Sequence, residues 1–305
     1  MRHTRMQISK YQALYTKFKN QPVQDVLAHF HPDRDPLTGS QDFDAPFRKI
    51  AAMTLEGPDA WEFTQPKFQN KYHSKPPKLR NYLLYTFARL RALEIAHPGE
   101  YFAESEDKNW VCFNTGLQDK HSADLYAIFL RYEPKPGINA ERPVSDWVYR
   151  GTVTSRLPVF RDHFGTKLPK LAWYSTDSRD YIFNTDYDLE TDIFDHMFER
   201  AKERSGFPED VTDESVRNYL RGAIENLLPK IKRNYKTAIP VYYIEEERMQ
   251  LLLPFHSSNG RDTACFLIER DDQRRCYRIK TILDMDHAFF AARLITRPDK
   301  EWLNP

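Results

Sequence analysis

Cysteine is scarce in this sequence of 305 residues, and the three cysteines are far from any metal-binding or redox spacing. Cys112, Cys265 and Cys276 lie in apolar, strand-like settings, and no CxxC pair is present. The pattern predicts buried free thiols in a reducing compartment. It argues against secretion, a structural zinc site and a disulfide framework.

Long hydrophobic runs are also absent. No apolar stretch reaches the length that is needed to cross a membrane. The N-terminal segment MRHTRMQISK is basic but lacks the apolar core of a signal peptide. We therefore expect a soluble cytoplasmic protein that has no membrane partner.

Four widespread catalytic and nucleotide-binding motifs are missing as well. The sequence contains no GxxxxGK[ST], no GxGxxG, no GxSxG and no HExxH. These absences argue against P-loop nucleotide hydrolysis, a nicotinamide cofactor, α/β-hydrolase chemistry and zincin chemistry. The sequence assigns neither a cofactor nor a metal.

The charges that are present are strongly segregated, although the net charge is only +1. Residues 1–20 and residues 65–93 carry lysines and arginines but no acidic residue, whereas residues 177–214 hold a dense acidic run. Such asymmetry points to a polyanionic partner. The alternative is that oppositely charged faces meet each other inside the fold.

The chain is expected to be organised around residues 213–255, where a basic helix leads directly into a sheet. Asp213 is a plausible N-cap, and apolar residues then recur at helical spacing up to Ile231, with Pro229 expected to kink or end the helix. The far end of the helix is basic, with Lys230, Lys232, Arg233 and Lys236. The helix macrodipole accounts for some of this charge, and phosphate binding is the functional interpretation.

The remaining pattern predicts an α+β fold: a helical N-terminal region, then a mixed domain that ends in a helix, a four-stranded antiparallel meander and a C-terminal helix. We expect the strands at residues 238–244, 249–255, 263–269 and 276–283. Upstream, the sequence predicts strands at 110–113 and 147–153 and a helix over 122–129. The expected segments are a helical region (1–60), a linker (61–78) and an α+β core domain (79–305).

A second basic region overlaps the linker and the helix that follows it. Cations alternate there with aromatic residues, a mixture that suits single-stranded nucleic acid because cations neutralise phosphates and rings stack on bases. Its candidate contacts are Lys78, Arg80 and Tyr82, and Tyr235 is the aromatic candidate near the first cluster. The alternative is that the aromatic residues belong to the core.

Two groups of residues could supply acid/base chemistry. The first is His196 with Glu199, on one face of a helix expected over 191–205, and the second is Asp284, Asp286 and His287. A solvated acidic helix with local ion pairs explains the first group equally well, and Asp284 or Asp286 can act as a helix cap.

Near the N-terminus, His31-Pro32-Asp33 and the later Phe47-Arg48-Lys49 resemble the loop and third helix of a J-domain co-chaperone. The preceding helix departs from that family, because it carries Gln24, Asp25 and His29 in place of a basic face. His29 and His31 with nearby aspartates could also bind a metal, whereas a Pro- and Asp-rich turn explains them without one.

Several C-terminal segments resemble a prokaryotic family catalogued only as a domain of unknown function, number 3825. The matching segments are Arg233-Asn234-Tyr235-Lys236, Gln250-Leu251-Leu252-Leu253-Pro254, Ala291-Ala292-Arg293-Leu294 and, upstream, Asn114-Thr115-Gly116-Leu117. The resemblance spans about residues 77–303. It implies RNA as a partner by association, because members occur beside cold-shock and winged-helix modules, and it transfers no catalytic residue.

Three functions therefore remain open. The first is binding of RNA or single-stranded nucleic acid. The second is an enzyme that processes RNA or nucleotides, such as a nuclease used as a toxin or defence effector. The third is a chaperone-linked adaptor that acts through His31-Pro32-Asp33.

Overall fold

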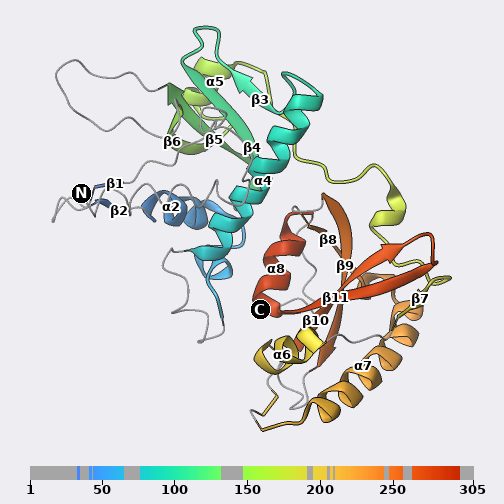
Figure 1. Cartoon of the computed structure of the whole chain (residues 1–305). Coiled ribbons are helices and arrows are strands. Elements are labelled where there is room, and N and C mark those ends of the chain that lie inside the picture. Colours follow the sequence, from blue (N-terminus) through green and yellow to red (C-terminus); the bar gives the residue numbers. More distant parts are fainter. Residues whose placement is uncertain are drawn as a thin grey trace, which may run out of the picture. The chain divides into compact units, whose positions relative to one another are not determined.

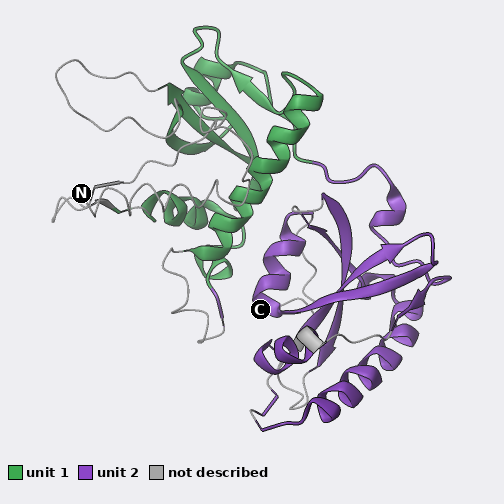
Figure 2. Cartoon of the chain, viewed as in Figure 1, with its two compact units in different colours: residues 1–62, 70–172 green, residues 63–69, 173–305 purple. Residues whose placement is uncertain are grey.

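The computed structural model describes residues 33–34, 41–42, 44–64, 76–131, 147–190, 195–204, 207–208, 210–243, 247–256 and 263–295. The chain forms two compact units, which are coloured separately in Figure 2. Unit 1 comprises Met1–Glu62 and Asn70–Ala172, and unit 2 comprises Phe63–Gln69 and Trp173–Pro305. The expected segmentation at residues 60 and 78 stays a prediction, because compactness does not report independent folding.

Unit 1 combines an antiparallel sheet with helices. The sheet has the order β3-β4-β5-β6 and contains β3 (Phe102–Glu104), β4 (Trp110–Gln118), β5 (Asp124–Arg131) and β6 (Trp147–Thr154). The helical elements are α2 (Ala45–Met53), η2 (Pro58–Trp61), α4 (Pro77–Ala96) and α5 (Pro158–Phe164), and a short pair joins β1 (Asp33–Arg34) to β2 (Gln41–Asp42).

Successive side chains of β4 pack on opposite faces of this sheet. Cys112 is buried in a cluster with Phe160 and Phe164 of α5. Its neighbour Phe113 lies 5.5 Å, ring to ring, from Phe87 of α4. The period of two that a strand imposes therefore gives α5 one face and α4 the other.

The predicted helix over residues 122–129 is wrong, because these residues belong largely to β5. Leu125, Ala127 and Phe129 pair with Thr154, Thr152 and Tyr149 of β6, while the other edge of β5 pairs with β4. β5 is thus a central strand buried on both faces, and such a strand is a nearly continuous apolar run whose periodicity does not distinguish it from a helix.

Unit 2 contains a five-stranded sheet with the order β7-β11-β10-β9-β8. The strands are β7 (Asp188–Leu189), β8 (Ile239–Tyr243), β9 (Arg248–His256), β10 (Thr263–Asp271) and β11 (Cys276–Asp284). β8 to β11 form the predicted antiparallel meander, and β7 adds a short parallel pairing to β11. The expected α+β class is confirmed.

The helices of unit 2 cover both faces of this sheet (Figure 1). Leu251 and Leu253 of β9 pack with α6 (Asp195–Arg204) and α7 (Asp213–Arg233), whereas Leu252 between them packs with α8 (Met285–Arg293). A short 3-10 turn, η3 (Ser178–Asp180), precedes β7, and another, η4 (Tyr235–Thr237), links α7 to β8. α7 and α8 therefore lie on opposite sides of the sheet.

Helix α7 starts one residue earlier than predicted and does not end at Pro229. Thr212 is the N-cap, and its Oγ1 accepts a hydrogen bond of 3.2 Å from the Ser215 amide. Asp213 lies in the first turn, where a carboxylate is favoured by the helix dipole. The helix continues through Pro229 to Arg233, because its buried side holds Leu227 and Ile231 in one core.

The first residues of the expected linker are packed and do not lie free on the surface. In unit 1, Trp61 is fully buried and its Nε1 donates a hydrogen bond to Thr54 Oγ1. In unit 2, Phe63 is buried, with its ring 5.3 Å from that of His287. Residues 65–75 of the expected linker lie outside the described part of the chain.

All three cysteines are free and buried, as the sequence predicted. Among the described residues, no helix combines the length and the hydropathy of a membrane span.

Candidate nucleic-acid interface

Three basic residues at the end of α7 and a fourth in η4 are exposed in unit 2. We call Lys230, Lys232, Arg233 and Lys236 the cationic end of α7. Tyr235 lies between Arg233 and Lys236 in the sequence and is 63% exposed. The predicted cluster is therefore a surface feature that holds four cations and one ring.

A tight backbone arrangement fixes this cluster where α7 meets η4. The amide of Asn234 donates to the Lys230 carbonyl at 2.9 Å, which closes the helix. The Asn234 side chain then accepts a hydrogen bond of 3.1 Å from the Lys236 amide and so starts η4. Arg233 Nη1 donates to the Pro229 carbonyl at 3.1 Å. Local hydrogen bonds thus hold Tyr235 and Lys236 close to the end of the helix.

Part of the acidic run of unit 2 is paired with other cations of the same unit. Arg270 of β10 pairs with Asp180 at 2.9 Å and with Asp272 at 3.0 Å, and Lys202 of α6 pairs with Asp213 at 2.7 Å. Arg179 donates hydrogen bonds to Asp177 and lowers the pKa of that carboxyl to about 2. Opposite charges therefore do meet in the fold, but they do so away from the cationic end.

The cationic end has a different electrostatic environment. Lys230, Lys232 and Arg233 form no ion pair with any residue that the structure describes. The negative end of the α7 dipole favours their charge, which explains why the cluster does not destabilise the helix. The helix dipole stabilises these charges but does not neutralise them, because it corresponds to only about half an elementary charge. The cluster therefore presents a positive surface.

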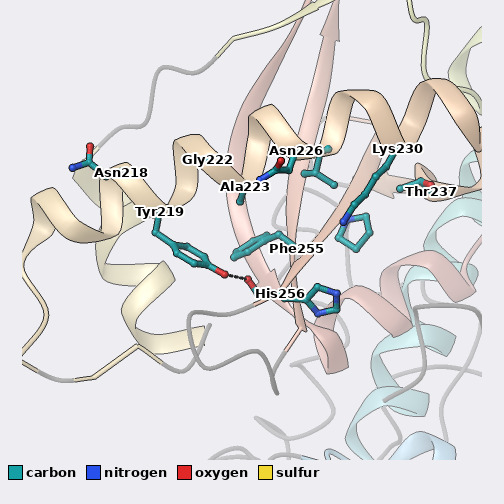
Figure 3. Close-up of a pocket in the computed structure, with 11 residues that line it drawn as sticks. Asn218, Tyr219, Gly222, Ala223, Asn226, Lys230, Thr237, Phe255 and His256 are labelled. Atoms are coloured by element: carbon teal, nitrogen blue, oxygen red, sulfur yellow. Dashed lines mark hydrogen bonds between the residues drawn. The ribbon is translucent and has the colours of Figure 1, made fainter.

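A groove adjoins this cluster, between α7 on one side and Thr237 and the end of β9 on the other. It encloses about 760 Å³. From α7 it is lined by Asn218, Tyr219, Gly222, Ala223, Asn226, Leu227 and Lys230, and from the other side by Thr237, Pro254, Phe255 and His256. Figure 3 shows Tyr219, Phe255 and Lys230 in the space between helix and strand.

This groove was not predicted, although the sequence carries a signal for it. Asn218, Gly222, Asn226 and Lys230 recur every four residues on α7, so they form one row on the helix surface. Two amides, a glycine and a lysine in one row are unusual for the packed side of a helix. The row adjoins the apolar face that the prediction did use.

In the second basic region, unlike at the cationic end of α7, two of the candidate contacts are buried in unit 1. Lys78 is fully buried, and Tyr82 is 2% exposed with its hydroxyl donating to the Thr115 carbonyl at 3.0 Å. A Cβ at Gly116 would lie 2.5 Å from the Tyr82 hydroxyl, so Gly116 leaves room for this contact. Burial removes Lys78 and Tyr82 from the surface candidates, whereas Arg80 is partly exposed.

Asp284 and His287 come together at the start of α8 as a helix cap. Asp284 is fully buried and accepts a hydrogen bond of 3.0 Å from the His287 amide, and its second oxygen lies 2.7 Å from His287 Nδ1. Burial raises the pKa of Asp284, but the bonds to His287 and the charge of Arg204 outweigh it, so the pKa lies below its ordinary value. The carboxylate has a structural role here.

Asp286 also has a structural role, because it binds a segment of unit 2 that is distant in the sequence. It is fully buried, and its carboxylate accepts hydrogen bonds from the amide and the hydroxyl of Thr64 at 2.9 and 3.1 Å. Glu199 is exposed on α6, and His196 lies in the same helix, in the turn before it. Within the described ranges, no group of three or more His, Cys, Asp or Glu residues is placed to hold a metal ion.

The acid/base candidates at α8 do not converge with the cationic end of α7. The two helices cover opposite faces of the five-stranded sheet. An enzyme that acts on a bound phosphodiester needs its acid and base in the same cleft as the groups that bind the substrate. Asp284, Asp286 and His287 do not meet this requirement.

The J-domain-like stretch lies only partly within the described residues. Asp33 forms part of β1, which pairs with β2. His29, His31 and Pro32 lie outside the described residues, and the adaptor hypothesis stays a prediction.

Comparison with known proteins gives a single result. A search of curated proteins and a search of solved structures each found no match. A family model does match, and it covers both the cationic end of α7 and the groove. That model, described as "Domain of unknown function (DUF3825)", matches residues 52–302, and the chain therefore belongs to this family.

Proposed function

We propose that the protein binds RNA or another single-stranded nucleic acid through the cationic end of α7. The observation that carries this proposal is that Lys230, Lys232 and Arg233 have no anionic partner among the described residues. Several acidic residues of the same unit are paired with other cations. A surface left positive in this way favours a polyanion that is supplied from outside.

The exposed ring of Tyr235 favours a single strand over a duplex. Base pairs in a duplex hide the faces of their bases, whereas an unpaired base can stack on an aromatic side chain. Tyr235 makes no ring contact with a described residue, so its face is available. Cations flank it on both sides in the sequence, as a stacking residue between phosphate contacts requires.

The proposal is tested by fluorescence anisotropy with a labelled single-stranded RNA at several salt concentrations. We expect the variant Lys232→Ala/Arg233→Ala/Lys236→Ala to bind more weakly. We also expect the slope of log affinity against log salt to fall by about 2, because each phosphate contact to a single strand contributes about 0.7.

The matched control is Lys120→Ala/Arg156→Ala/Lys167→Ala, which removes the same charge from exposed positions of unit 1. If both triple variants lose affinity equally, net charge alone explains the binding and the proposed site is wrong. A probe that is shortened on a gel after the titration would favour the nuclease-type alternative.

A further inference from the structure

We infer that the groove between α7 and β9 receives the base of an unpaired nucleotide whose phosphate lies on Lys230. This inference rests on the proposed function, and it adds to it a site for the base. Lys230 belongs both to the cationic end of α7 and to the lining of the groove, so a strand that is bound at one feature is already at the mouth of the other.

The size and charge of the groove fit a base. Its volume of about 760 Å³ lies in the range of small-molecule sites. Asn218 and Lys230 are twelve residues apart on α7, which corresponds to about 18 Å along the helix. No acidic residue lies among the described lining residues, so nothing there repels a phosphate.

The groove offers both kinds of contact that a base requires. The exposed amide of Asn226 forms no hydrogen bond with a described residue, so it can donate to and accept from a base edge. Both walls also contribute an aromatic ring, Tyr219 from α7 and Phe255 from β9. Tyr219 is held in place by its hydroxyl, which donates to the His256 carbonyl at 2.7 Å, and Phe255 is stacked on Phe266.

Gly222 is the observation that points most directly to a ligand. Glycine weakens a helix interior, and a Cβ at Gly222 would meet nothing within 4 Å, so packing does not require a glycine here. The missing side chain widens the groove between the two asparagines. A position that gives up helix stability to keep a groove open is expected where a ligand approaches the backbone.

The test compares a single strand with the same strand in which the bases are replaced by abasic residues. Both ligands carry the same phosphates, so their affinity ratio isolates the contribution of the bases. We expect the wild-type protein to prefer the strand with bases by about five- to a hundred-fold, the range for stacking contacts. We expect Gly222→Leu to lower this affinity ratio, because the leucine side chain fills the groove. The preference that remains should be the part contributed by stacking on Tyr235, and the salt slope should not change.

Two further variants keep the result interpretable. Gly151→Leu in β6 places the same side chain at another glycine whose Cβ would meet nothing within 4 Å, and should retain the wild-type ratio. Asn226→Ala removes one amide without filling the groove and should lower the ratio several-fold. Circular dichroism checks that each variant is folded, and if Gly222→Leu is not, Asn226→Ala decides the inference.

The outcomes separate this inference from the proposed function. An unchanged ratio in folded Gly222→Leu or, failing that, in Asn226→Ala overturns the inference, and the proposed function stands if the triple variant still loses affinity. Absence of binding by the wild-type protein overturns both. A free mononucleotide that competes as strongly as the strand would overturn the assignment to a strand and assign the groove to a free nucleotide.

Discussion

Asp284 and Asp286 show how structural carboxylates can resemble catalytic groups in a sequence, Asp284 as the N-cap of α8 and Asp286 as an acceptor for Thr64. Both are fully buried at the start of α8, and both accept hydrogen bonds from the protein itself. A sequence shows that an aspartate begins a helix. It does not show that Thr64, far away in the sequence, will occupy the second carboxylate.

The lowered pKa of Asp284 makes a contribution to stability that depends on pH. In the folded state the pKa lies below its ordinary value of 3.8. The contribution is therefore complete above pH 3.8 and is lost as the pH falls through the folded pKa. Asp284→Asn keeps the capping acceptor but carries no charge. We expect it to cost about 1 kcal/mol at neutral pH and to reduce the loss of stability on acidification.

Urea unfolding at neutral pH and at about pH 2.5 measures both effects. Glu199→Gln removes a carboxylate that is exposed on α6 and serves as the control. If Asp284→Asn loses as much stability on acidification as the wild-type protein does, the charge of Asp284 does not contribute in the way argued.

Single residues also show the limit of sequence reasoning about the surface. The exposure of the cationic end of α7 was predictable, because four basic residues cluster where an amphipathic face ends. Lys78 and Tyr82 were misjudged because α4 buries residues on several sides, so polarity does not identify its exposed face. The groove was missed because a row of small and polar residues has no fixed interpretation without the strand opposite to it.

At the scale of elements, the four-stranded meander was predictable and β5 was not. The strands of the meander are separated by short polar turns, which are local signals. Strand β5 gains its structure from pairing with β4 and β6, and β6 lies beyond a long segment of sequence. Tertiary pairing therefore overrides a local pattern that is compatible with a helix.

Helix α7 retains a stability defect at Pro229 that a single substitution should remove. Proline inside a helix lacks the amide hydrogen bond and crowds the preceding turn, at a cost of up to about 3 kcal/mol relative to alanine. Pro229 is exposed, so little packing is lost on substitution. We expect Pro229→Ala to raise the free energy of unfolding by about 1–3 kcal/mol, as measured by urea denaturation.

Pro229→Gly provides the comparison, because it removes the ring but does not favour the helix. It should stabilise the protein less than Pro229→Ala does. A loss of stability in Pro229→Ala would mean that the proline ring makes a contact that holds the end of α7 and η4 in place.

For the whole molecule, the α+β class followed from the order of elements, whereas the division into two units did not. Each unit has a buried core of its own, and each core contains a cysteine that can report on its opening. Cys112 packs with Phe160 in unit 1, and Cys265 packs with α8 in unit 2. Burial raises the pKa of both thiols, so neither forms the reactive thiolate while its surroundings stay folded.

Alkylation of these cysteines should therefore follow the opening of each unit separately. Phe160→Ala removes a core ring of unit 1, at a cost of about 3–5 kcal/mol. We expect it to accelerate alkylation of Cys112 more than that of Cys265, as measured by mass spectrometry in mild denaturant. Leu220→Ala in unit 2 should have the opposite effect. Equal acceleration of both cysteines in either variant would show that the two cores open as one cooperative unit.

The hydrogen bonds between Thr64 and Asp286 also affect the timing of synthesis. These residues are 222 positions apart, yet they belong to the same compact unit. At typical elongation rates, the ribosome needs roughly 10 to 45 seconds to travel that distance. During this interval Phe63 has emerged without the helix that will cover it. A nascent chain of this protein therefore carries an apolar segment whose partner is made 222 residues later, and a chaperone at the ribosome would be of most use during that interval.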